Sequence, residues 1–183
     1  MKIKAATLFT ILAMIGHIIN ISAQSVPTLR SNVSATIVEA ITLSETASMN
    51  FGANVLTTTE GGTVVLNSSS NTRAYTGGLA SGGPETQDAT NATFEVRGSS
   101  LATYALTLPS AITLTHTSIG TGINTMDVTS MKARFNAAGA DAVTSKIASD
   151  GTDSFTLGAT LTVQEDQVLG QYHGTYQVSV NYN

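Results

Sequence analysis

The fold class is decided by the last stretch of the chain, Gln171-Tyr-His-Gly-Thr-Tyr-Gln-Val-Ser-Val-Asn-Tyr182, in which side chains alternate without a break. The residues of one parity are aromatic, small or β-branched, whereas those of the other parity are polar. Successive side chains of a β-strand point to opposite faces, so the stretch predicts a strand with one face on a core and one in water. A register slip of one residue would exchange these faces, which makes the pairing of this strand specific.

Shorter runs with the same alternation recur upstream and are separated by turn residues such as Gly, Ser, Asn and Asp. We expect strands over residues 33–43, 63–66, 92–96, 104–108, 112–114, 124–135 and 155–163. Residues 67–89 are expected to form a loop, with a short strand around 73–76, and the best helix candidate, 137–148, has little apolar face. The pattern predicts an all-β immunoglobulin-like antiparallel β-sandwich, with a closed β-barrel as the structural alternative.

The N-terminus has the three-part layout of a secretory signal peptide. Lys2 and Lys4 precede an apolar run over residues 5–21, and small residues follow it up to Ala23. A retained membrane helix is the alternative, which polar residues inside the run disfavour. We expect cleavage after Ala23, so residues 1–23 are a signal peptide and the mature protein is secreted or held at the cell surface after export through the periplasm.

The rest of the chain fits one domain on the usual size range. We divide it into an N-terminal extension, 24–32, which is a candidate donor strand, and a β-sandwich domain, 33–183. An alternative is that residues from Val33 onward, which also read as the first strand of the domain, leave only a short segment to donate.

The composition excludes several classes of protein. The chain has no cysteine, so no disulfide framework can stabilise it. Its hydrophobic fraction of 42% is too high for a disordered polar tract. Removal of Lys2 and Lys4 with the signal peptide changes the net charge from −4 to −6. Such a balance disfavours nucleic acid and anionic membranes as partners of the mature protein.

Several segments together resemble the DUF4402 family of exported bacterial proteins, whose function is unassigned. The resemblance rests on Ser34–Leu43, Asn50-Phe-Gly52, Thr103–Pro109, Leu161-Thr-Val163 and Gly170–Asn183. A weaker likeness extends to spore-coat-U and chaperone-usher pilin subunits. Pilins of that route tend to carry a glycine fourteen positions from the C-terminus and a penultimate aromatic residue, as Gly170 and Tyr182 are here. Many relatives also have a disulfide that holds the first strand, which this chain lacks.

The residues give little support for an enzyme, a cofactor or a metal site. His116 and His173 are the histidines left after signal removal, and each reads as an edge or solvated side chain. Asp150-Gly-Thr-Asp153 offers two carboxylates but reads as a turn. We find no nucleophile elbow and no phosphate-binding loop, so a hydrolase is the weakest hypothesis.

The leading hypothesis is a pilin-like structural subunit of a surface appendage or extracellular matrix that assembles by β-strand addition. Its partners would be copies of itself or related subunits, together with a periplasmic chaperone. The candidate assembly residues of the terminal strand are Gly170, Tyr172, Tyr176, Val178, Val180 and Tyr182. Those of the donor segment are Leu29, Val33, Ala35 and Ile37, which share one parity. The alternative is a self-complete secreted binding module that recognises a glycan or a surface protein through the loops 67–89 and 137–153.

Overall fold

The computed structural model describes residues 28–83, 89–118, 121–136 and 138–183. The expected signal peptide lies outside these residues. The contacts within the chain divide it into two units, residues 1–36 and 37–183. Residues 28–36 of the first unit have no regular secondary structure and are exposed. The second unit contains the strands, and the described residues include no helix that could cross a membrane.

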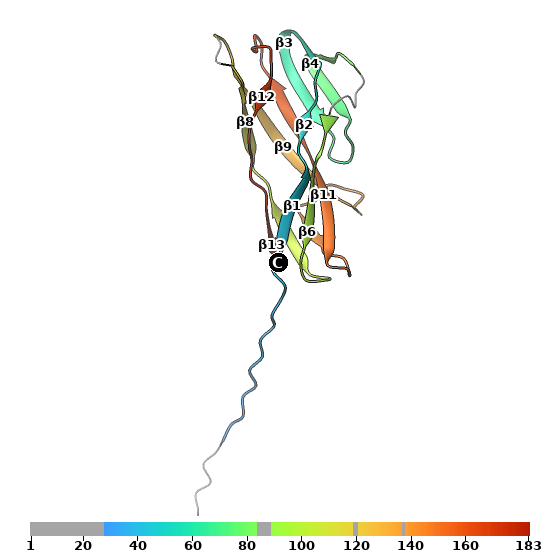
Figure 1. The fold of residues 1–183 in the computed structure, drawn as a ribbon, viewed down its shortest axis with the longest axis vertical. Helices are drawn as coiled ribbons and strands as arrows, with labels where there is room; N and C mark the ends of the chain where they lie inside the picture. Colours follow the sequence, from blue (N-terminus) through green and yellow to red (C-terminus); the bar gives the residue numbers. More distant parts are fainter. Residues whose placement is uncertain (1–27, 84–88, 119–120, 137) are drawn as a thin grey trace, which may run out of the picture. The chain divides into compact units, whose positions relative to one another are not determined.

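The strands of the second unit form antiparallel sheets (Figure 1). The largest sheet has the strand order β1-β6-β11-β9-β8-β12, with β3 and β4 attached beside β11. Its strands are β1 (Thr42–Ala47), β3 (Val55–Leu66), β4 (Arg73–Ser81), β6 (Ala92–Arg97), β8 (Ala111–His116), β9 (Thr125–Phe135), β11 (Thr152–Val163) and β12 (Tyr172–His173). A second sheet contains β7 (Thr103–Thr107), β10 (Thr144–Lys146) and β13 (Ser179–Tyr182), and a short ladder joins β2 (Asn50–Phe51) to β5 (Ala89–Thr90).

β11, whose residues 155–163 were predicted as a strand, lies in the interior of the large sheet. Its apolar residues Phe155, Leu157, Ala159, Leu161 and Val163 are all buried. One edge of β11 pairs with β9, while the other pairs first with β6 and then with β3. The change of partner occurs at Gly158, where a side chain would collide with the backbone at the end of β3. Glycine is therefore required at this junction.

Two groups of buried side chains form the core. The first is aromatic: Phe94 stacks on Phe155 with ring centroids 5.1 Å apart, and Phe135 meets Phe155 and Tyr104 edge to face at 5.5 and 5.9 Å. The second is mainly aliphatic and includes Val64, Val128 and Leu161 among others. Aromatic pairs of this geometry add stability beyond the burial of their area.

The prediction of an antiparallel β-sandwich is confirmed, because the unit is all-β with antiparallel sheets in a sandwich-like arrangement. The large sheet curves into an open half-barrel and does not close, so the closed-barrel alternative is wrong. Among the described residues, β1 pairs only with β6 and β13 pairs only with β7. β1 and β13 approach each other, yet no ladder joins them. The fold therefore keeps two neighbouring strand edges unpaired.

Several predicted elements differ from those of the structure. The strand expected over 33–43 begins only at Thr42, because residues 33–41 have no strand to pair with in the described chain. The expected loop 67–89 contains the nine-residue strand β4, which pairs with β3. The predicted C-terminal strand 171–182 is divided into β12 and β13, because its two ends pair with strands of different sheets.

Candidate functional site

The C-terminal segment crosses from one sheet to the other between β12 and β13. β12 pairs with β8 and β13 pairs with β7, while residues 174–178 lie between the two ladders. The link from β7 to β8, residues 108–110, crosses alongside and contains Pro109, which has no N–H to donate. Among the described residues, no backbone hydrogen bond joins 174–178 to another element. The crossover thus presents unpaired backbone groups.

A groove of about 860 Å³ lies against this crossover. One side is formed by residues 174–179, and the other by the end of β1 and the turn that follows it. The apolar lining comes from Met49, Phe94, Leu108, Pro109, Tyr176 and Val178. Among the described lining residues, Glu45 is the one that carries a charge, and its side chain is exposed. The groove therefore combines an apolar lining, an unpaired backbone edge and one negative charge.

Tyr176 links this groove to the interior. Its side chain packs against both core groups. Its hydroxyl oxygen is buried and has no hydrogen-bond partner among the described residues. Burial raises the pKa of Tyr176 to about 12, and the nearby carboxylate of Glu45 adds to the shift. A buried hydroxyl without a hydrogen-bond partner is unfavourable for stability.

Tyr182 fixes the start of the domain through a clasp, formed by Tyr182, Ser99 and Glu39. The Tyr182 hydroxyl donates to the carbonyl oxygen of Glu39 at 2.8 Å and accepts the N–H of Ser99 at 2.7 Å. The N–H of Glu39 in turn donates to the Ser99 hydroxyl at 2.8 Å. Tyr182 therefore anchors the chain just before β1, and the described residues before Glu39, 28–38, form no strand.

The residues before this clasp continue the predicted donor segment 24–32 as far as Ile37, and from here on the whole stretch is called the extension. It is mostly apolar on one parity, and its described residues have no strand partner. Residues 28–40 are all exposed. The exposed fractions are 94% for Leu29 and 96% for both Val33 and Ile37. Ala35 shares their parity and is exposed as well. Single exposed apolar side chains are common, but a run of them on one parity is unusual.

The structure divides the six predicted assembly residues of the C-terminal segment. Tyr176 and Val178 line the groove, while Val180 and Tyr182 belong to β13. Gly170 and Tyr172 lie at the far end of the segment, away from the groove, and face His116. The rings of Tyr172 and His116 meet at 4.9 Å, and Gly170 has a φ of 144°, where a side chain would collide with the imidazole. These two residues shape a turn and do not contribute to the groove.

The part of the chain that matches a known protein family coincides with the part that forms the strands. The family described as "Domain of unknown function (DUF4402)" matches residues 41–182. This chain belongs to the DUF4402 family. The match begins one residue before β1 and ends on the last residue of β13, so the DUF4402 domain contains every described strand and leaves the extension outside. No curated protein and no solved structure matched the chain.

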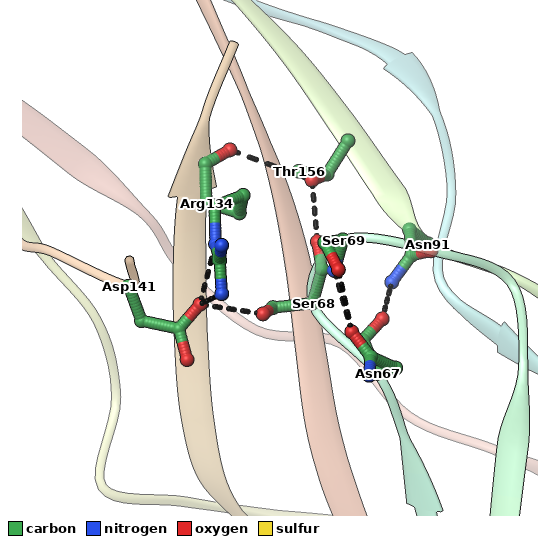
Figure 2. A network of polar contacts seen from close by, with 7 residues as sticks. All are labelled: Asn67, Ser68, Ser69, Asn91, Arg134, Asp141 and Thr156. Carbon is green, nitrogen blue, oxygen red and sulfur yellow. Dashed lines mark hydrogen bonds and ion pairs between the residues drawn. The ribbon is translucent and has the colours of Figure 1, made fainter. Parts of the chain in front are cut away.

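A polar network ties two loops of the DUF4402 domain to its central strands (Figure 2). Asp141 accepts hydrogen bonds from the Ser68 hydroxyl at 2.6 Å and from Nε of Arg134 at 2.9 Å. The pKa of Asp141 is below its usual value. The hydrogen bond from the Ser68 hydroxyl is the main cause, and the Arg134 guanidinium lowers the pKa further. Thr156 on β11 donates to the carbonyl oxygen of Ser68 at 2.6 Å.

Asn91 extends this network into the interior. Its side-chain amide is buried and donates to the carbonyl oxygens of Asn67 at 2.5 Å and Leu157 at 2.9 Å. The turn after β3 and the loop after β9 are thus fixed at their bases. Both belong to the loops that the binding-module hypothesis assigns to recognition, and a fixed base favours a rigid scaffold there.

A second groove, of about 700 Å³ and lined by more charged residues, lies near β10 and the turn before β11. Its acidic groups are engaged locally: Asp153 accepts from the Tyr104 hydroxyl at 2.9 Å and from Ser145 at 2.6 Å. Glu95 forms an ion pair with Arg97. The pKa of Tyr104 is raised mainly because its side chain is buried, and the hydrogen bond to Asp153 raises it further.

The segment Asp150–Asp153 was predicted to be a turn; Asp150 and Gly151 form the turn before β11, and Thr152 and Asp153 are the first residues of β11. Asp150 accepts hydrogen bonds from the N–H and the hydroxyl of Thr152 at 3.0 and 2.9 Å. Those two bonds lower the pKa of Asp150. Asp153 points instead to Tyr104 and Ser145. Among the described residues, no cluster of three His, Cys, Asp or Glu side chains lies so as to hold a metal ion.

Proposed function

We propose that this protein is an exported structural subunit of a surface appendage or extracellular matrix, and that its copies assemble by β-strand addition. One observation carries the proposal. The segment 29–37 exposes four apolar side chains on one parity, which Ser31 interrupts, while the domain has strand edges that are unpaired among the described residues, beside an apolar groove. An extended segment added to such an edge gains main-chain hydrogen bonds, and its alternate side chains enter the apolar lining.

The apolar segment of the extension and the C-terminal segment beside the groove have the same length. Residues 29–37 number nine, as do residues 174–182, which border the groove and form β13. Nine residues in a strand span roughly 30 Å. The interpretation of residues from Val33 onward as the domain's own first strand would have left too short a donor. The start of β1 at Thr42 supports a donor of nine residues.

The proposal is tested with a matched pair of substitutions in the extension. Val33→Asp places a charge on the apolar parity, whereas Ser34→Asp places the same charge one residue later on the polar parity. Because an unpaired charge in an apolar groove is costly, Val33→Asp and Leu29→Asp are expected to abolish most of the polymer, and Ser34→Asp is not. Electron microscopy and size-exclusion chromatography of protein from the native host measure the polymer fraction.

Deletion of residues 24–36 complements these variants. It is expected to give a folded, soluble monomer with an unchanged melting temperature, because the lost contacts are intermolecular. Polymer at the level of the unmodified protein in Val33→Asp, Leu29→Asp and the deletion variant would contradict strand addition by this segment.

The second candidate is a self-complete secreted binding module for a glycan or a surface protein. The second groove favours it, because Lys146 lies in its lining and the Lys146 side chain forms no hydrogen bond or ion pair among the described residues. A module of this kind would be monomeric with or without residues 24–36, and Lys146→Ala would weaken its binding to a surface glycan array or to host-cell proteins. A monomeric unmodified protein in the native host would select this function over strand addition.

A further inference from the structure

The clasp lies at the end of β13, beside the start of β1. Tyr182 is the last residue of β13, and its side chain reaches across to the backbone of Glu39 and of Ser99, with bonds of 2.8 and 2.7 Å. Cα atoms of β1 and β13 come within 8 Å of each other, although no ladder joins the two strands among the described residues. The clasp therefore ties together two neighbouring strand edges that are otherwise unpaired there.

An added strand needs more room than the two strands leave. Hydrogen-bonded neighbours in a sheet lie about 4.8 Å apart, so a strand inserted between β1 and β13 would hold them about 9.6 Å apart. The groove beside residues 174–178 is free of this limit, because those residues belong to no ladder. An extended segment can enter the groove there, but it cannot continue between β1 and β13 as they stand.

A donor of nine residues is longer than the part of the groove that is open to it. The segment 29–37 spans roughly 30 Å in a strand, whereas the five residues 174–178 span roughly 17 Å. The other four residues of the donor match β13, which has four residues, Ser179–Tyr182. Full insertion therefore has to move β13 away from β1, and the clasp opposes this movement.

We propose that the clasp of Tyr182, Ser99 and Glu39 is a gate, which holds β1 and β13 together in the free subunit and opens when residues 29–37 of a second copy are fully inserted. This inference rests on the proposed function and adds a means of regulating it. Insertion and opening of the clasp are thermodynamically linked, so a change that weakens the clasp strengthens the binding of the donor.

The test measures binding to the acceptor groove alone. The mature chain with Val33→Asp is expected to stay monomeric, so it presents the groove without a competing donor. The ligand is a fluorescent peptide of residues 24–38, and fluorescence anisotropy measures its dissociation constant.

Substitutions in the clasp are then added to that chain. Tyr182→Phe keeps the ring and removes both bonds of the hydroxyl, so it is expected to lower the dissociation constant about tenfold, because more of the acceptor is open before binding. Ser99→Ala removes only the bond from the Glu39 N–H, and we expect a decrease of about threefold. Asn181→Ala, on the exposed parity of β13, is the matched control and should leave the constant unchanged. Melting temperatures control for folding, and Ser99→Ala keeps the test decisive if Tyr182→Phe proves unstable.

Hydrogen exchange provides a second measurement in a chain whose clasp is intact. The Glu39 N–H donates to the Ser99 hydroxyl in the free subunit, and insertion is expected to break this bond. The peptide should therefore accelerate exchange at Glu39, whereas a ligand that merely stabilised the domain would slow it. The same peptide carrying Val33→Asp is the control and should change nothing.

The outcomes separate the gate from the proposed function. If the peptide binds every variant equally, or slows exchange at Glu39, strand addition stands and the gate is wrong. Weaker binding to Tyr182→Phe would make the clasp a part of the acceptor and would also overturn the gate. If the peptide binds none of the variants, this groove is not the acceptor and the gate fails with it. The proposed function itself fails if Val33→Asp leaves the polymer fraction unchanged.

Discussion

The N-terminal extension and the C-terminal segment carry the same kind of sequence and occupy opposite environments. Both alternate apolar and polar residues, over 29–37 and over 171–182. In the C-terminal segment, Tyr176, Val178, Val180 and Tyr182 are partly buried and pack against the core, while the polar parity is exposed. In the extension, both parities are exposed. Alternation thus specifies which face a strand would bury, but burial depends on a neighbouring edge being available.

The largest expected effect comes from truncating the apolar parity where it is packed. Tyr176→Ala is expected to lower the free energy of unfolding by about 2–3 kcal/mol, somewhat less than the loss for a fully buried aromatic side chain. The matched change in the extension, Ile37→Ala, is expected to stay within about 0.5 kcal/mol in the monomer, because Ile37 is 96% exposed. Urea denaturation of both variants measures the difference. Equal losses would mean that the two segments are equally packed.

A smaller loss is expected from Tyr182→Phe, which keeps the ring and removes the clasp between the two ends of the domain. The hydroxyl bonds both Glu39 and Ser99, so its loss is expected to cost about 1–2 kcal/mol. Hydrogen exchange at the Glu39 amide should accelerate, whereas Asn181→Ala, on the exposed parity, should leave it unchanged. Unaltered exchange in Tyr182→Phe would refute the clasp.

The environment of Tyr176 also predicts a dependence of stability on alkaline pH. Its pKa is raised from 10.0 to about 12 in the folded protein, because burial disfavours the phenolate. Between pH 10 and 12 the unfolded chain loses this proton before the folded chain does, so stability is complete below pH 10 and falls as the pH rises toward 12. Chemical denaturation across this range should give a shallower decline for Tyr176→Phe. Parallel declines would show that Tyr176 does not contribute.

The smallest effects are expected on the exposed parity of the C-terminal segment. Gln177→Ala and Ser179→Ala should each change the free energy of unfolding by no more than about 0.5 kcal/mol, because both side chains lie in water. If either variant lowered the free energy of unfolding as much as Tyr176→Ala, the polar parity, and not the apolar one, would face the core.

The extent to which the sequence predicted the fold differs between elements. The strands β6, β7, β8, β9 and β11 lie close to their predicted positions, because their alternation is local and their partners lie in the same domain. Most of β4 was expected to be a loop, because Gly77 and Gly78 interrupt the alternation of apolar and polar residues in its sequence. Those glycines are required because a side chain at either would collide with residues 58–62 of β3 and its bulge.

The candidate site was predicted only in part. Sequence alternation identified Tyr176, Val178 and the apolar parity of the extension. The contribution of β1 through Glu45, and of the link containing Pro109, carried no sequence signal, because these residues meet the C-terminal segment only after the chain has folded. The Tyr176 hydroxyl has no hydrogen-bond partner among the described residues, and this too follows from the neighbours that the folded chain brings to it.

The sequence by itself therefore determined the all-β class, the facing of most strands and the presence of an apolar segment at each end. Tertiary structure alone decided that the C-terminal segment divides between two sheets, that no ladder joins β1 to β13 among the described residues, and that residues 28–41 pair with no strand there. The physical reason is that the side-chain pattern along a strand is a local property, while strand pairing is a long-range contact that many residues decide together.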